Sequence, residues 1–177
     1  SDAELQTYYN AHAEDFDQEA RTKISYIKLD KTPSKSDEDR VERQINDIYQ
    51  RLLGGEDFEK LAKDFSEDGS ADNGGDLGFF GAGTMVKEFE ETAFTTDSGE
   101  IAPPVKTMFG WHIIKVEEKK REDNEPQVRA RHILLKTAVG QQTLRDMDQK
   151  ATSLLERAQE DGLEAAVVSL PDDSLDV

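Results

Sequence analysis

Three polar residues flank a stretch of the chain that is rich in glycine and phenylalanine. Residues 74–94, GGDLGFFGAGTMVKEFEETAF, contain five glycines followed by a run of Phe and Met. Asp68 comes just before this stretch, and Thr107 and His112 come just after it. The stretch has two interpretations: a glycine loop that binds a phosphate, or the wall of an apolar pocket.

The phosphate interpretation is the weaker one. A phosphate loop needs backbone N–H groups that converge at the N-terminus of a helix, usually with a lysine that reaches the phosphates. Here Asp76 lies among the glycines, and the first lysine after them is Lys87. We therefore expect the glycines to let the chain bend tightly and bring apolar side chains together. These side chains are Leu77, Phe79, Phe80, Met85, Phe89 and Phe94.

The apolar residues could all be ordinary core, and an inward-facing histidine is more often structural than functional. Two features favour a site. So many aromatic residues around a glycine turn leave little regular structure to bury them, and Asp68, Thr107 and His112 are close by in the sequence.

The elements that must position these residues follow from hydrophobic periodicity. Residues 2–16 predict a short amphipathic helix, and residues 23–30, KISYIKLD, predict a strand. A long helix through Val41–Leu52, with Ser36 and Asp39 as its capping box, ends at Gly54.

A second helix is expected over residues 57–65 and a short one over about 86–94, where Met85 and Phe89 share a face. Residues 110–119 predict a closing strand, with His112 on the same buried face as Ile114 and Val116. The pattern indicates an α+β domain.

The beginning of this domain recurs about 105 residues later in the chain. VRARHILLK resembles RTKISYIKLD, and LLERAQEDGLEAAVVSLPDDS resembles IYQRLLGGEDFEKLAKDFSED. In this register Tyr26 matches His132, Phe58 matches Leu163 and Asp68 matches Asp173. The second copy stops before any counterpart of the glycine stretch, so we expect it to be half a domain.

The composition excludes several function classes. With 39 acidic and 22 basic residues the formal net charge is −17, which opposes binding to nucleic acid and to anionic membranes. The chain has no cysteine, so disulfides and thiolate catalysis are excluded. No run of residues is long and apolar enough to span a membrane, and both ends resemble cuts within a longer protein.

Over residues 20–120 the sequence resembles the parvulin-type peptidyl-prolyl isomerases. The resemblance is carried by GGDLG, by the M-x-x-x-F spacing of Met85 and Phe89, and by FGWHII. It implies a parvulin, FKBP-like fold, in which a small antiparallel sheet is packed by three to four helices. It also implies an isomerase that needs neither metal nor cofactor.

The resemblance assigns roles to residues of this chain. Its polar cluster falls on Asp68, Thr107 and His112, and its proline pocket on five apolar residues: Leu77, Phe80, Met85, Phe89 and Phe109. The family usually has a histidine in the first strand, facing the second one, and here that position is Tyr26. Tyrosine can donate a hydrogen bond to His112 but does not titrate near neutral pH, so activity is expected to be reduced.

Four segments are expected. Residues 1–19 form a helical arm, 20–120 the isomerase domain, 121–127 a charged linker and 128–177 the first half of a second domain. Because half a domain leaves an open sheet edge, the last segment is expected to be partly disordered or to pair with another chain. The arrangement resembles the multidomain foldases of the bacterial periplasm or cell envelope.

Two functions remain open. The first is isomerisation of X-Pro bonds in unfolded or partly folded polypeptides, and the second is peptide binding by a catalytically weak chaperone module. A phosphopeptide-binding role would need a basic cluster after the first strand, and DKTPSKSDEDR dilutes its cations with acidic residues.

Overall fold

A computed structural model describes residues 1–13, 22 and 24–168. The described residues divide into two units, one made of residues 30–151 and the other of the described residues before 30 and after 151. Residues 14–19 of the expected arm, Lys23 and Asp173 lie outside the described residues.

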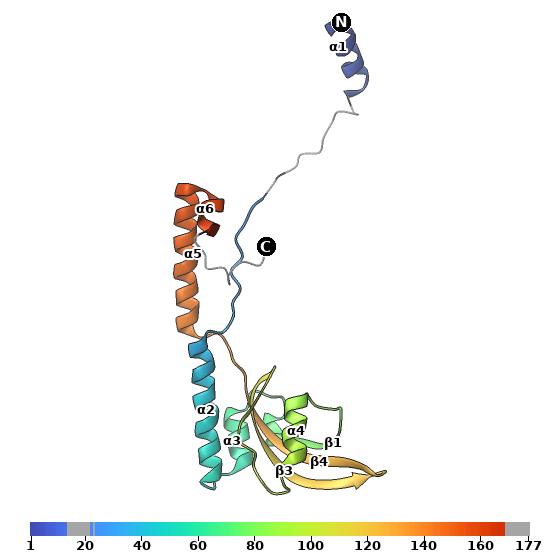
Figure 1. Cartoon of the computed structure of the whole chain (residues 1–177), viewed down its shortest axis with the longest axis vertical. Helices are drawn as coiled ribbons and strands as arrows, with labels where there is room; N and C mark the ends of the chain where they lie inside the picture. Colours follow the sequence, from blue (N-terminus) through green and yellow to red (C-terminus); the bar gives the residue numbers. More distant parts are fainter. Residues whose placement is uncertain (14–21, 23, 169–177) are drawn as a thin grey trace. The chain divides into compact units, whose positions relative to one another are not determined.

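The unit of residues 30–151 is built on a four-stranded antiparallel sheet in the order β1-β4-β3-β2. The strands are β1 (Asp76–Gly81), β2 (Val105–Thr107), β3 (Gly110–Glu122) and β4 (Glu125–Leu135). Helices lie around this sheet (Figure 1): α2 (Lys35–Leu53), α3 (Phe58–Phe65) and α4 (Lys87–Thr95), together with a short 3₁₀ turn at Ala71–Asn73. The architecture is α+β, as predicted.

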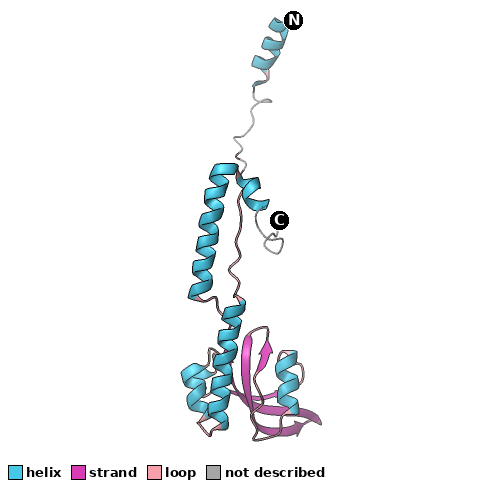
Figure 2. Ribbon diagram, turned by 60° about the vertical axis from the view of Figure 1, so that its left-hand side comes forward, coloured by secondary structure: helices cyan, strands magenta, loops and turns pink. Residues whose placement is uncertain are grey.

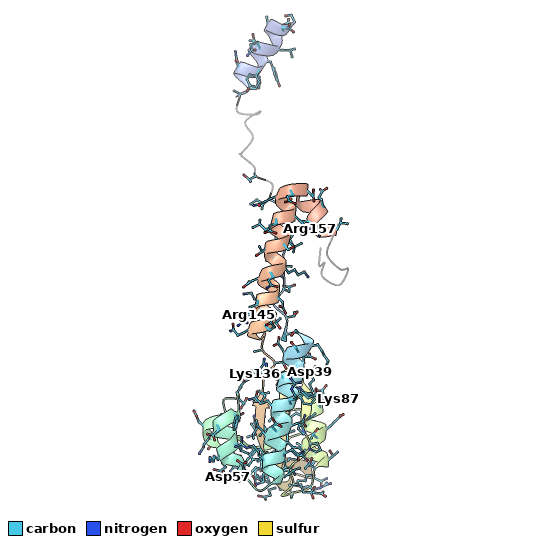
Figure 3. The ribbon with its side chains drawn as sticks, turned by 90° about the vertical axis from the view of Figure 1, so that its left-hand side faces the viewer. Asp39, Asp57, Lys87, Lys136, Arg145 and Arg157 are labelled. Carbon is cyan, nitrogen blue, oxygen red and sulfur yellow. The ribbon has the colours of Figure 1, made fainter. Side chains whose placement is uncertain are left out.

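Each face of the sheet packs against its own helices. On one face Ile113, Ile133 and Leu135 pack with the apolar stripe of α2 and with α3. On the other face Ile114 and Val116 pack with α4 and the phenylalanines of the glycine stretch. Figure 2 shows the strands between these two groups of helices, and in Figure 3 Asp57 and Lys87 mark the starts of α3 and α4.

Local sequence explains these helices. The apolar residues of α2 recur every three or four positions and are buried, which is the amphipathic pattern that the sequence predicts. Its capping box is formed by Ser34 and Asp37 rather than by Ser36 and Asp39. Asp57 caps α3, and its carboxylate accepts a hydrogen bond from the Lys60 N–H.

The remaining helices are α1 (Asp2–Ala11), α5 (Gln141–Asp161) and α6 (Leu163–Val168). No helix in the described part of the chain combines the length and the apolar composition that a bilayer crossing requires.

The structure corrects three expectations about strands. Residues 24–30, expected as the first strand, have no regular secondary structure, and Ile24 and Tyr26 are exposed. Residues 121–127, expected as a linker, instead contain the turn of the β3–β4 hairpin, where Asp123 and Asn124 adopt positive φ. Residues 76–81 form strand β1, which was not predicted because glycine has a low strand propensity.

The second copy is also placed differently from the expectation. Its first strand is not an open edge, because β4 pairs with β1 on one side and with β3 on the other. The strand that was expected to begin a second copy is therefore an inner strand of this sheet.

Candidate active site

Two histidines lie side by side on the α4 face of the sheet. His112 comes from β3 and His132 from β4, and the two Nδ1 atoms are 3.3 Å apart. Their rings are nearly parallel, with an interplanar angle of 17°. Both side chains are buried, so each must find hydrogen-bond partners inside the protein.

His132 is held by the loop that follows α3. Asp68 Oδ2 lies 3.2 Å from His132 Nε2, and Ser70 Oγ is also 3.2 Å from that nitrogen. The Ser70 hydroxyl and backbone N–H both donate to Asp68 Oδ2. The loop is fixed to β4, since the Glu67 N–H donates to the Leu134 carbonyl and the Leu134 N–H donates to Ser66 Oγ.

His112 is held by the turn between β2 and β3. Its Nε2 lies 2.8 Å from Thr107 Oγ1, which also accepts a hydrogen bond from the Phe109 N–H. The strand pairing brings these groups together, because Thr107 is paired with Gly110 in the adjacent strand.

The four side chains form one continuous hydrogen-bonded chain. With both histidines neutral, His132 donates from Nε2 to Asp68, so its Nδ1 accepts from Nδ1–H of His112. Nε2 of His112 then accepts from the Thr107 hydroxyl. Each bond fixes the tautomer of the next ring, which gives the site a defined polarity from Thr107 to Asp68.

The pKa shifts follow from this arrangement. Burial and the nearby His132 lower the pKa of His112 to about 4. Burial also lowers the pKa of His132, although Asp68 opposes the effect. Partial burial of Asp68 disfavours its charge, but the hydrogen bonds from Ser70 and His132 outweigh burial and hold its pKa well below the usual range. At neutral pH the site therefore contains two neutral imidazoles and one carboxylate.

One phenylalanine of the glycine stretch contacts both histidines, and a second one packs against it. The ring of Phe89, on α4, meets His112 edge-on at 5.4 Å and His132 at 5.6 Å. Phe80 lies behind Phe89, with the two ring centroids 6.1 Å apart. Leu77 and Met85 are half-buried against the same cluster.

The five expected pocket residues thus differ in exposure. Phe80 and Phe89 are almost fully buried, Leu77 and Met85 are half-buried, and Phe109 is exposed. Phe109 occupies the β2–β3 turn together with Met108, which is also exposed. Of the five residues, Leu77, Met85 and Phe109 are therefore the ones with surface left to contact a ligand.

The glycines allow particular backbone conformations and do not form a phosphate-binding loop. Gly74 and Gly75 lead into β1, Gly78 and Gly81 lie within it, and Gly83 follows it in the turn before α4. At Gly75, with φ +77°, a Cβ would lie 2.2 Å from the carbonyl oxygen of His132. The Gly75 carbonyl accepts a hydrogen bond from the His132 N–H, so this glycine allows the loop to lie directly against β4.

The structure brings together Asp68, Thr107 and His112, as expected from the sequence, but not Tyr26. Tyr26 belongs to the other unit and is 79% exposed. His132 stands beside His112 instead. The sequence contained a signal for this residue, because His132 matches Tyr26 in the repeat, but we expected it to serve a separate half-domain.

Comparison with known proteins matches the chain to one domain family and to several named relatives. The profile of the PPIC-type PPIase domain matches residues 8–120. The foldase protein PrsA of Geobacillus kaustophilus is 56% identical over 87 residues, which are 48% of this chain and 31% of that protein. The chaperone SurA of Saccharophagus degradans is 42% identical over 136 residues, 71% of this chain and 31% of that protein.

A crystal structure of the peptidylprolyl isomerase PrsA from Bacillus cereus shares 48% sequence identity with the chain and has a TM-score of 0.45. The aligned region is 46% of this chain and 32% of the chain in that structure. The chain spans about a third of the length of the curated relatives that it matches.

Proposed function

Because the chain belongs to the PPIC-type peptidyl-prolyl isomerase family, we propose that its histidine site catalyses cis-trans isomerisation of X-Pro bonds in unfolded or partly folded polypeptides. The observation that carries the proposal is the hydrogen-bonded chain of Asp68, His132, His112 and Thr107 beside an apolar surface.

The chemistry requires no covalent step. Rotation about the X-Pro bond crosses a barrier of about 18–20 kcal/mol, and no bond is broken. The planar amide is stabilised by charge separation between its oxygen and nitrogen, and water hydrogen bonds strengthen that separation. An apolar environment that removes water from the amide therefore favours the twisted form.

We assign different roles in this isomerisation to the apolar and the polar residues of the site. Leu77, Met85 and Phe109 would contact the pyrrolidine ring, and Phe80 and Phe89 would support them from behind. The neutral His112–His132 pair and the Thr107 hydroxyl would set the local field and position the carbonyl as the bond twists. Asp68 acts through His132 as a positioning residue.

The alternative is a peptide-binding module with weak catalysis. The exposed Met108 and Phe109 favour peptide binding, and they serve either function. The sequence argument for weak catalysis was Tyr26 in place of a histidine. That argument does not apply to a site in which His132 stands beside His112.

A protease-coupled peptide assay tests the proposal, together with the refolding of a protein whose slow phase is proline isomerisation. His112→Ala and Asp68→Ala should each reduce the isomerisation rate by about tenfold or more. If both variants keep the parent rate while binding an unfolded polypeptide normally, the chain is a binding module and the isomerase proposal is wrong.

The same relatives are the basis for a proposal about the cellular role. We propose that the clients are exported polypeptides in the periplasm or cell envelope, and the relatives named foldase and chaperone support this proposal. The net charge of −17 makes nucleic acid an unsuitable partner.

A further inference from the structure

The chain contains two segments suited to one position in the sheet. Residues 24–30 and 130–136 match at an offset of 106, and Gln141 follows Lys35 by the same offset. Each segment is thus followed, after the same number of residues, by the first residue of a long helix. In the structure the second segment, as part of β4, lies between β1 and β3.

The helix that covers β4, however, is the one that follows the first segment in sequence. Ile133 and Leu135 of β4 pack in the same core cluster as Val41 and Ile45 of α2. Their counterparts in the first segment are Ile27 and Leu29, the same two residue types. The first segment therefore carries the side chains that this core requires.

The connection also fits. The chain that leaves β4 runs to the N-terminus of α2, where the Arg40 guanidinium donates to the Ala138 carbonyl. There the Thr143 hydroxyl donates to Asp37, and Thr143 Oγ1 lies 2.7 Å from Oγ of Ser34, the N-cap of α2.

Residues 136–140 therefore run from the end of β4 to a point beside the start of α2. Residues 30–34 are a linker of the same length and end at that same N-cap. If the first segment took the strand position, it would reach α2 without any movement of that helix.

We propose that residues 24–30 exchange with β4 for the position between β1 and β3 of the same chain, so that the domain has two forms. One form places His132 beside His112, and the other places Tyr26 there. The expected division into domains 20–120 and 128–177 corresponds to the second form. The inference goes beyond isomerase activity and does not depend on it.

Three differences explain why β4 occupies the position. Leu134, which is 4% exposed, corresponds to Lys28, whose ammonium group would be costly to bury. Arg131 lies near the carboxylates of Glu59, Asp76 and Glu117, and its counterpart Ser25 would bring no cation to them, leaving Lys115 beside Glu117. Ala130 is fully buried and corresponds to the larger Ile24.

Disulfide trapping in the full chain tests the exchange, and the natural chain has no cysteine to interfere. Lys115 pairs with Arg131, so Lys115→Cys with Arg131→Cys reports the β4 form. Ser25 is the counterpart of Arg131, so Lys115→Cys with Ser25→Cys reports the exchanged form. Lys119→Cys with Ser25→Cys is the off-register control, because Lys119 pairs with Val128.

We expect the Ser25–Lys115 disulfide to form within single chains, more slowly than Arg131–Lys115 and faster than Ser25–Lys119. Adding Arg131→Ser and Leu134→Lys, which place the first segment's residues in β4, should raise its rate by about tenfold or more. Adding Ile27→Lys should lower its rate to that of the off-register control, since Ile27 would take the place of the fully buried Ile133.

Two results would overturn the proposal. One is a Ser25–Lys115 rate no higher than that of the off-register pair in the otherwise unchanged chain, a comparison that needs no weakened β4. The other is a Ser25–Lys115 disulfide found only between two chains, on non-reducing gels across a dilution series.

Discussion

The two faces of the β3–β4 pair differ sharply although they alternate along the same strands. On the α2 face, Ile113 and Ile133 are directly paired and belong to an aliphatic core. On the α4 face, the neighbouring positions carry His112 and His132 among aromatic rings. The α2 face is thus a purely apolar core, whereas the α4 face combines its own apolar cluster with buried polar groups that need a complete set of partners.

The comparison predicts that stability depends most on the aliphatic face. Ile133→Ala removes a fully buried side chain, so it should lower the free energy of unfolding by about 4 kcal/mol. Leu155→Ala, at a position that is 59% exposed, is the control and should change it by less than about 0.5 kcal/mol. Urea denaturation followed by circular dichroism measures both. Equal losses would mean that this core does not stabilise the sheet as described.

The loop that carries the site should tolerate little change where it touches β4. Gly75→Ala combines a positive φ with a clash against the His132 carbonyl and should cost about 3 kcal/mol or more. Gly78→Ala shares the positive φ but meets open space, so it should cost about 1–2 kcal/mol. Thermal melts of the two variants separate the contact from backbone strain. If the Gly78 variant were as unstable as the Gly75 variant, the close contact between Gly75 and the His132 carbonyl would not explain the loss.

Acid should act through the histidine face. The folded pKa of His112, about 4, is below its ordinary value of 6.5, so the unfolded chain binds more protons between these values. Stability contributed by neutral His112 is complete above pH 6.5 and falls as the pH drops toward 4, by about 3 kcal/mol in total. Burial lowers the pKa of His132 too, which adds loss in the same direction.

Urea denaturation at pH 7 and pH 4.5 measures this dependence, and His112→Phe isolates the contribution of one ring. That variant should lose less stability between the two pH values than the parent chain. An identical pH dependence in both chains would contradict a neutral, buried His112.

The smallest predicted effect concerns a single hydroxyl. Thr107→Val keeps the side-chain shape but removes the partner of His112 Nε2, so isomerase activity should fall several-fold and stability by about 1 kcal/mol. Thr143→Val is the control, because it removes a buried threonine hydroxyl that donates to Asp37 and not to a histidine. It should reduce stability but leave kcat/KM unchanged. Equal activities would mean that the Thr107 hydroxyl is only structural.

The local parts of this fold could be read from the sequence. The stripe Val41, Ile45, Ile48 and Leu52 predicted α2, because a helix that buries one face must repeat apolar residues every three or four positions. The inward direction of His112 followed from strand alternation in the same way.

The long-range parts could not. The sequence patterns of residues 24–30 and of β4 both predict a strand, and local pattern does not say which of them pairs with β3. The choice depends on tertiary neighbours such as the acidic groups around Arg131. Strand β1 was missed because its glycines lower strand propensity, and only its pairing with β4 makes it regular.

The central claim is that His132, from β4, completes the proposed site beside His112. The most direct test is kcat/KM for a prolyl peptide in His132→Tyr, which places the residue type of the first copy beside His112. We predict a loss of about tenfold or more, larger than the loss in Tyr26→Phe, with melting curves confirming that both variants are folded. A folded His132→Tyr variant with the parent activity, alongside a larger loss in Tyr26→Phe, would contradict the account.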